Sequence, residues 1–526
     1  MLDTILQNCF LYRLIAWLRQ TYHKGALAAF FARLRLWYQS SLARRVWERF
    51  LSVPCRAGQS LWGRFLRLLD RACTVCGRWL EQSALMRLWR WAAAKCRRAA
   101  QRSLVLKAIH TVGVRGWILI ALGLYLPLDY LFRSVLSISF LSSVWDEMLI
   151  LFALGYLILR KMTTPALQGK TRANTLECYI LLFFAVGFLL MMIHSPIFSI
   201  AVAGYRAQVQ YMIWFLLALR LIENDRDFAL FYGTLLCMGT LIALHGIYQF
   251  IVAAPIPSSW VSQTEMSVRT RVYSLTGSPN IMGCLMVLLA PLAAAVAYWA
   301  KKRWVKVLAM GCTGLMCLAC LFTFSKGAWL GLIVAVVVFS LLLDKRLLAL
   351  MGSVGAAALV LVPSVANRIT YLFTADYAAA SARGGRAVRW ATGLELLHNN
   401  DQWFGFGLGR FGGAVAMQNQ VLETSDTFSY FYMDNYYLKT LVEMGYVGLF
   451  FFLLLLLGLM IWGLRSVGRT RQTSVHPLAV GILSALSGVL VHCYFENIFE
   501  VPYMMGYFWA MAAALIYLGF FRPARK

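Results

Sequence analysis

Arginine side chains recur in the polar segments that separate the long apolar runs of this chain. A guanidinium is permanently charged, and its planar fork binds phosphate oxygens in a bidentate manner. We therefore expect the set to converge on an anionic ligand, although ordinary solvated loop charge explains any single member equally well. The set comprises Arg206, Arg269, Arg271, Arg383, Arg386, Arg389 and Arg410.

Polar residues of other types stand at the edges of the same segments. Asp434 and Asn435 directly precede an apolar run, Asn280 opens another, and Lys326 lies at the end of a third. Asp434 is a candidate general base, although a carboxylate with an ordinary pKa of about 3.9 is a weak base at neutral pH. The alternative is that Asp434 caps the following helix or makes a structural hydrogen bond.

Composition sets the fold class. Of the 526 residues, 60% are hydrophobic and 14% are charged, and the mean hydropathy is +0.66. Soluble domains have about 25% charged residues. Because a bilayer is crossed by about 20 apolar residues, the sequence predicts an all-α integral membrane protein.

Twelve runs qualify as transmembrane helices, and a large external loop at 364–435 separates the ninth from the tenth. A proline, Pro127, interrupts the first run, so the number of helices is open by one pair. The runs are 117–132, 145–160, 175–193, 207–222, 227–252, 281–300, 305–323, 327–343, 347–363, 436–464, 478–496 and 503–521.

The orientation follows from the positive-inside rule. With a cytoplasmic N-terminus, every strongly basic short connection falls inside: Arg160 to Arg172, Lys301 to Lys306, Lys345/Arg346, Arg465 to Arg471 and the C-terminal Arg522 to Lys526. The segments 194–206, 254–280, 364–435 and 497–502 then face outward. Since basic residues are disfavoured on that side, a cluster of outward-facing arginines indicates a function.

Residues 1–112 form a separate basic region ahead of the membrane domain at 113–526. Their first 110 residues hold 20 Lys/Arg against four Asp/Glu, together with seven Trp. Serines recur about every 20 residues and predict helix starts at Ser41, Ser60, Ser83 and Ser103. Basic amphipathic helices rich in Trp suit the surface of an anionic leaflet. We therefore expect anionic lipids, and no nucleic acid, as the partner of this region.

Other motifs predict no cofactor and no metal. Cys73-Thr74-Val75-Cys76 lacks the second ligand pair of a zinc site. Asp225-Arg226-Asp227 has the form of a metal-binding DxD but is interpreted as a solvated turn in a cytoplasmic connection. The glycines of 405–409 lack the strand-to-helix context of a dinucleotide site, and P-loop and HExxH motifs are absent from the sequence.

Four short blocks occur in an order that resembles the O-antigen ligase / O-antigen polymerase family of bacterial envelope glycosyltransferases. The similarity covers about 117–521. The blocks are Arg271 with Gly277-Ser278-Pro279-Asn280, Thr323 to Ala328, Gly385-Arg386 with Phe404 to Gly407, and Asp434-Asn435-Tyr436-Tyr437-Leu438 with Glu443-Met444-Gly445.

The resemblance implies a metal-independent, inverting glycosyltransferase of the inner membrane with an outward-facing active site. Its donor would be a polyprenyl-diphosphate-linked glycan, and its acceptor a hydroxyl of another glycan or lipid-linked molecule. Arg271 and Arg386 match the functional arginines of the family. Asp434 stands where ligases tend to have His, which favours polymerase over ligase without deciding between them. The implied binding residues are Arg389, Arg206, Lys326, Asn280 and Asn435.

A membrane transporter of a small anionic solute is the alternative function. A transporter places polar groups near the middle of the membrane, in broken helices. The informative polar residues of this chain lie instead at the predicted outer surface and in the long loop, which favours the transferase.

Overall fold

A computed structural model describes residues 29, 33, 36–37, 40–52, 57–167, 171–257, 270–361, 363–371, 373–375, 385–421 and 430–523. These residues form helices and no strand, which confirms the all-α prediction. The chain divides into two compact units, Met1–Cys55 and Arg56–Lys526. The first unit contains α4 (Leu42–Ser52), where the Ser41 hydroxyl accepts a hydrogen bond from the Arg44 amide at 3.2 Å.

Among the described residues of the second unit, seven helical segments are long and apolar enough to cross a membrane. An eighth span results if Ile109–Gly123 and Tyr125–Val135, which are bent by 74° near Pro127, count as one. The count of twelve is therefore not confirmed. The seven are Ser142–Thr163 in α9 (Ser139–Thr163), α10 (Thr175–Ile193), α13 (Asp225–Ile251), α14 (Pro279–Trp299), α15 (Arg303–Phe322), α22 (Tyr436–Thr470) and Pro502–Phe521, which joins α24 (Pro502–Ile516) and η8 (Tyr517–Phe521).

The remaining predicted spans are shorter helices. Three of them, α16 (Lys326–Leu342), α17 (Arg346–Leu361) and α23 (His476–His492), are apolar but have 17 residues or fewer. The predicted span 207–222 is divided between α11 (Phe198–Val209) and α12 (Ile213–Leu221), which the short 3-10 turn η4 separates. Most of the predicted outer segment 194–206 is consequently helical.

Serine caps delimit the helices that precede the membrane spans. Ser60 caps α5 (Leu61–Gln82) and Ser83 caps α6 (Ala84–Arg102), each hydroxyl accepting a backbone amide hydrogen bond at 3.2 Å. Both predicted helix starts are therefore confirmed, and α7 (Leu104–Gly123) begins directly after Ser103. One face of α5 packs on α9, where Asp70 forms a 2.8 Å ion pair with Lys161.

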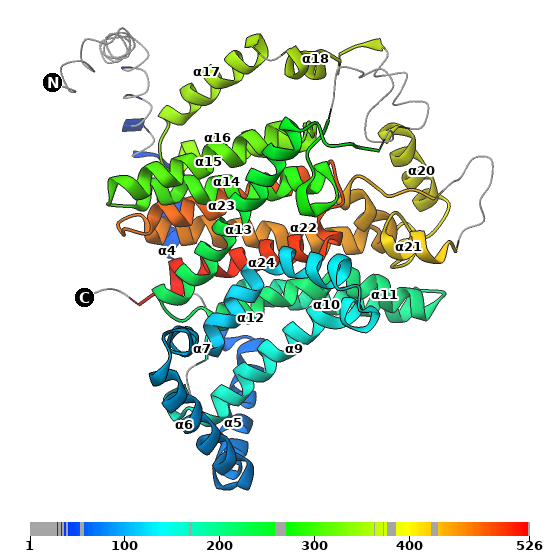
Figure 1. Cartoon of the computed structure of the whole chain (residues 1–526). Coiled ribbons are helices and arrows are strands. Elements are labelled where there is room, and N and C mark those ends of the chain that lie inside the picture. The colour runs from blue at the N-terminus through cyan, green and yellow to red at the C-terminus, as the bar shows by residue number, and fades with distance from the viewer. Residues whose placement is uncertain are drawn as a thin grey trace, which may run out of the picture. The chain divides into compact units, whose positions relative to one another are not determined.

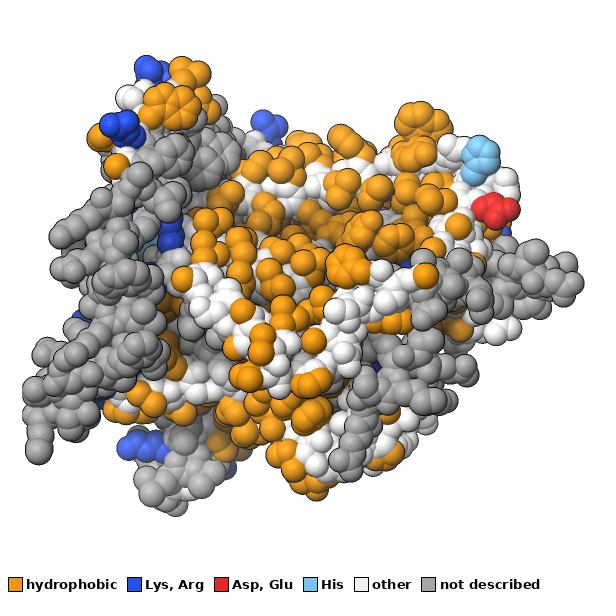
Figure 2. All heavy atoms as spheres, turned by 90° about the horizontal axis from the view of Figure 1, so that it is seen from above, with side chains coloured by type: hydrophobic (Ala, Val, Ile, Leu, Met, Phe, Trp, Pro, Cys, Tyr) orange, Lys and Arg blue, Asp and Glu red, His pale blue; other side chains and the backbone are white. Residues whose placement is uncertain are grey.

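Four helices form the centre of the second unit. As Figure 1 shows, α14, α15, α16 and α23 lie side by side, and α14 contacts the other three. Paired glycines let α16 and α23 approach closely, because a Cβ on Gly331 or Gly488 would lie within 2.8 Å of the carbonyl oxygen of the other. Hydrophobic side chains cover the middle of the face seen in Figure 2, as expected for a surface in contact with lipid.

A break in α22 holds part of the long loop in place. Gly445 has a φ of 66°, so the helical hydrogen bonds are interrupted there. The segment 402–407 fills the gap: the amides of Tyr446 and Val447 donate to the carbonyls of Gln402 and Trp403 at 2.9 and 3.1 Å. In return, the amides of residues 406 and 407 donate to the carbonyls of residues 442 and 443 at 2.7 and 3.1 Å. The loop is thereby bonded directly into the helix.

Candidate active site

The carboxylate of Asp434 lies at the centre of a cluster of donors. Its Oδ2 accepts from Arg386 Nε at 2.6 Å and from Arg389 Nη2 at 3.0 Å, and its Oδ1 accepts from Trp390 Nε1 at 3.0 Å. The Asp434 side chain is only 10% exposed, whereas those of Arg386 and Arg389 are 32% and 33% exposed. One carboxylate therefore orients two arginines whose outer parts remain accessible.

Helix α20 (Arg386–His398) presents all three donors from its first turns. Residues three or four positions apart share a helix face, so Arg386, Arg389 and Trp390 point the same way. At the other end, Leu397 packs into a buried apolar cluster with Phe406, Phe411, Met433, Leu438 and Val442, which joins α20, the inserted loop and α22. The positions of the arginines thus depend on the loop that fills the break in α22.

Arg271 is held from a separate part of the chain. It is 8% exposed, and its Nε donates to the carbonyl oxygen of Thr323 at 2.9 Å. Its Nη2 donates to Asn280 Oδ1 at 3.1 Å. Asn280 lies in the first turn of α14, and its amide nitrogen donates to a carboxylate oxygen of Glu496.

Glu496 connects the two arginine groups. It follows α23, directly after Phe495, whose carbonyl oxygen accepts from Arg386 Nη2 at 2.9 Å. Burial raises the pKa of the Glu496 carboxyl, and the charge of Asp434 raises it further; the Asn280 hydrogen bond and the Arg386 charge act in the opposite direction. The site therefore contains two carboxylates in different environments: Asp434 bound by three donors, and Glu496 shifted toward greater basicity.

Five of the eight predicted site residues come together in this network: Arg271, Asn280, Arg386, Arg389 and Asp434. The N-cap proposed as an alternative role for Asp434 belongs to its neighbour, since Asn435 Oδ1 accepts from the Leu438 amide at 3.0 Å at the start of α22. The helix-cap alternative for Asp434 is therefore wrong.

The other predicted residues have different contacts. Lys326 opens α16, and its Nζ lies 5.0 Å from the centre of the Tyr371 ring. Arg206 is exposed in α11 and forms an ion pair with Glu147. Arg410 packs on the Phe406 ring at 3.9 Å. Arg269 and Arg383 lie outside the described residues.

Two residues that lie near the arginines were not predicted as site residues from the sequence. Glu496 is the last residue of the predicted span 478–496, next to the predicted outer segment 497–502, and this position is the one signal that could have identified it. His492 is buried at the end of α23, beside Gly327 of α16, and within the described part of the chain neither ring nitrogen has a hydrogen-bond partner. A lone histidine in an apolar run gives no comparable signal.

The DxD-like motif is not a solvated turn, which corrects that interpretation. Asn224 caps α13 at this point, and Asp225 binds Arg522 through two hydrogen bonds of 2.7 and 2.8 Å. Asp227 is buried and pairs with Arg115 at 3.0 Å. Both carboxylates therefore hold helices together at this end of α13.

Comparison with known proteins identifies one domain. Residues 311–453 match the family model described as O-Antigen ligase (Wzy_C), and no curated protein matches the chain. The matched region contains Lys326, Arg386, Arg389, Asp434 and the break in α22, while Arg271, Asn280 and Glu496 lie outside it. This result confirms the resemblance inferred from the short blocks: the described residues are helical with candidate membrane spans, and residues 311–453 are similar to the O-antigen ligase family.

Proposed function

We propose that this chain is a membrane glycosyltransferase that moves a glycan from a polyprenyl-diphosphate carrier to a hydroxyl group on the outer side of the inner membrane of a bacterium. The observation that carries the proposal is that Arg386 and Arg389 converge on Asp434, while Arg271 is joined to Glu496 through Asn280. These residues come from distant parts of the chain and meet at the ends of apolar helices. A lipid-linked donor requires such a position, because its tail stays in the bilayer.

The arginines suit the leaving group. Negative charge grows on the diphosphate as its bond to the sugar breaks, and cations held at that position stabilise the transition state. The partly exposed guanidiniums of Arg386 and Arg389 are oriented by Asp434, and Arg271 is oriented by Thr323 and Asn280. We assign these three arginines to diphosphate binding, with Asp434 and Asn280 as positioning residues.

We assign the role of general base, which takes the proton of the acceptor hydroxyl, to Glu496 and not to Asp434. Asp434 already accepts three hydrogen bonds, two of them from arginines, so its oxygens are engaged by donors of the protein. Burial raises the pKa of the Glu496 carboxyl above its ordinary value, which strengthens it as a proton acceptor. In the proposed step the acceptor oxygen attacks the anomeric carbon and its proton passes to Glu496. The bond from that carbon to the diphosphate breaks, and the polyprenyl diphosphate leaves with the electron pair. Attack from the face opposite the leaving group inverts the anomeric centre.

The remaining predicted residues have supporting roles in this proposal. Asn435 fixes the start of α22 next to Asp434. Lys326 and Arg206 lie at helix positions on the predicted outer side and would contact more distant parts of the glycan or its diphosphate. The transporter alternative is not supported, since the matched domain is that of a glycan ligase.

The test uses the full chain in lipid with a polyprenyl-diphosphate oligosaccharide as donor and no nucleotide sugar. We expect release of polyprenyl diphosphate. A ladder of longer lipid-linked glycans would identify a polymerase, and release that requires a separate acceptor would identify a ligase. Arg271→Ala and Arg386→Ala should each abolish release, while Lys345→Ala, a change at an exposed residue between α16 and α17, should leave it unchanged. Normal release by both arginine variants would overturn the proposed role of the arginines, and solute flux without release would indicate a transporter.

A further inference from the structure

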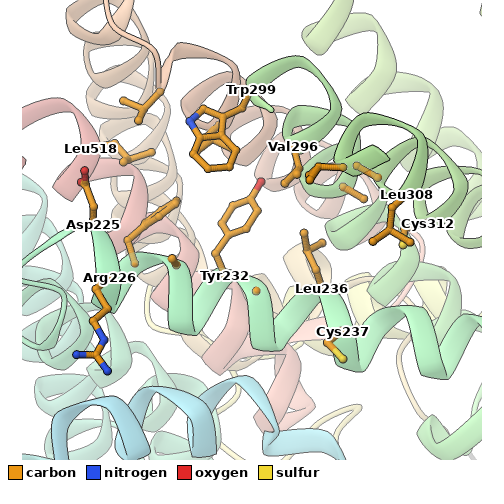
Figure 3. Close-up of a pocket in the computed structure, with 18 of the residues that line it drawn as sticks. Asp225, Arg226, Tyr232, Leu236, Cys237, Val296, Trp299, Leu308, Cys312 and Leu518 are labelled. Atoms are coloured by element: carbon orange, nitrogen blue, oxygen red, sulfur yellow. The ribbon is translucent and has the colours of Figure 1, made fainter. Parts of the chain in front are cut away.

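A large apolar cavity lies between α13, α14 and α15, and the start of α23 and residues 518–522 close one end of it. Its volume is about 750 Å³. Figure 3 shows side chains from α13, α14 and α15 lining the cavity. We call it the α13–α15 cavity; its lining includes Tyr232, Leu236, Val296, Trp299, Leu308 and Cys312.

The cavity is long and opens sideways. Its lining residues on α13 run from Asp225 to Leu241, a distance of about 24 Å at about 1.5 Å per residue. A Cβ added at Gly233, in the middle of this stretch, would meet no atom within 4 Å. Leu241 and Leu308, on opposite walls, are exposed. A narrow space of this length, open between two helices that face lipid, fits an extended hydrocarbon chain.

Two hydroxyl groups in the middle of the cavity wall already donate their hydrogen bonds within the protein. The Tyr232 hydroxyl donates to the carbonyl oxygen of Leu292 at 2.8 Å, and the Thr240 hydroxyl donates to that of Leu236 at 2.8 Å. Both hydroxyl hydrogens are therefore used within the protein. A sugar or a free anion would lose its hydration here without replacement, whereas a hydrocarbon chain from the membrane has no hydration to lose.

Basic residues surround one end of the cavity. Arg522 lines it and is paired with Asp225. Lys302 and Arg303 are exposed and lie between the lining residues Trp299 and Val305, at the start of α15. An anionic headgroup at this end would meet an excess of positive charge.

This end is far from the candidate active site. Trp299 at the cavity and Asn280 at the arginine network lie at opposite ends of α14. Their separation of 19 positions corresponds to about 29 Å of helix, close to the thickness of the hydrocarbon core of a bilayer, about 30 Å. The basic end of the cavity therefore lies on the side of the membrane opposite the active site, and the donor diphosphate does not reach it.

We propose that the α13–α15 cavity binds one acyl chain of an anionic phospholipid from this leaflet, with the phosphate at Lys302, Arg303 and Arg522. The bound chain fills the space between α13 and α15. With the acyl chain bound, α14 is packed along its whole length, from the cavity to Asn280 at its other end. The proposal is independent of the reaction assigned to the active site.

The first experiment measures lipid retention by native mass spectrometry of the full chain, titrated with phosphatidylglycerol. We expect one tightly retained molecule in the wild type. Gly233→Phe places a ring in space that the acyl chain would fill and should weaken retention about tenfold or more, or ~1.4 kcal/mol. The matched control is Gly155→Phe, because Gly155 on α9 also has no atom within 4 Å of an added Cβ but lies outside the cavity. Equal retention by the two variants would overturn the proposal.

The headgroup is tested separately. Lys302→Gln combined with Arg303→Gln should weaken retention of phosphatidylglycerol by about fivefold or more, the effect of at least one basic residue near an anionic lipid. Lys345→Gln combined with Arg346→Gln changes the same charge in another exposed connection and should have no such effect. If phosphatidylcholine with the same acyl chains were retained as well as phosphatidylglycerol, the proposed preference for an anionic headgroup would be overturned.

A third experiment locates the bound acyl chain in the protein without relying on variants. Phosphatidylglycerol with a photoreactive acyl chain should label peptides that contain residues 225–241 or 293–312. Labelling elsewhere only would contradict the proposed site. Labelling of these peptides by a photoreactive polyprenyl diphosphate, with competition by unlabelled donor and none by phosphatidylglycerol, would show that the cavity holds the donor tail instead.

Discussion

Replacing Gly445 by alanine should damage the site from a distance. Gly445 has a φ of 66°, and a Cβ there would lie 2.6 Å from the amide nitrogen of Gly405 and closer still to the carbonyl oxygen of Trp403. These are backbone atoms of the inserted segment, which cannot rotate away as a flexible side chain would. The segment must therefore move out of the gap in α22.

The cost has two parts. A non-glycine residue in the left-handed region costs about 1–2 kcal/mol. Displacing the segment also breaks the hydrogen bonds from Tyr446 and Val447 to the carbonyls of residues 402 and 403, at about 1 kcal/mol each. The expected loss in free energy of unfolding is thus about 3–4 kcal/mol for Gly445→Ala.

Gly113→Ala separates the two parts. Gly113 has a φ of 70°, and an added Cβ would meet no atom within 4 Å. It should therefore lose only about 1–2 kcal/mol. We would compare both variants with the wild type by equilibrium unfolding in detergent and by polyprenyl diphosphate release. Gly113→Ala should retain release, and Gly445→Ala should lose most of it, because the loop that moves also positions α20. Equal stability losses, with release retained in both variants, would refute the argument that the inserted segment supports the site.

Three further predictions concern the network itself. Asp434→Asn keeps the shape of the side chain but removes the charge shared by two arginines. Release of polyprenyl diphosphate should therefore fall at least about 100-fold, or ~2.7 kcal/mol. A smaller effect than that of Asn435→Ala would contradict the positioning role of Asp434. Glu496→Gln should reduce release about 100-fold or more, the range for loss of a general base. In the wild type, release should decline as the pH falls through the raised pKa of Glu496, above the ordinary carboxyl value of 4.5, because the protonated carboxyl accepts no proton. That decline should be absent from the pH profile of Glu496→Gln, and an unchanged profile would contradict the assignment. Arg386→Lys should lose about tenfold or more in release, since one ammonium cannot reproduce the separate bonds of Arg386 to Asp434 and Phe495; full activity of this variant would show that a point charge is sufficient.

Sequence patterns predicted the elements better than their connections. Long apolar runs identified the membrane helices because hydropathy depends on composition alone, and Ser60 and Ser83 marked helix starts because a cap is a local interaction. Where a run was short or carried polar residues, as at 207–222, the pattern could not distinguish one span from two helices separated by a turn. Tertiary packing decides that question.

In the candidate site, too, the residue types could be predicted from the sequence, whereas the contacts that depend on tertiary packing could not. Arginine chemistry predicted that Arg271 and Arg386 would share a ligand site, and the structure brings them into one network through Asn280 and Glu496. The role of Glu496 could not be predicted, since it depends on contacts with residues more than 60 positions away. The insertion of the loop at Gly445 was equally hidden, although the glycines at 405 and 445 were both part of the quoted blocks.

The break in α22 also constrains the order in which the protein is built. Backbone amides and carbonyls left without partners at membrane depth are costly, so the gap at Gly445 requires its inserted segment as soon as α22 enters the bilayer. That segment, residues 402–407, precedes α22 in the chain and is therefore synthesised before Gly445. Closing the gap at Gly445 thus requires no residue that is translated after α22.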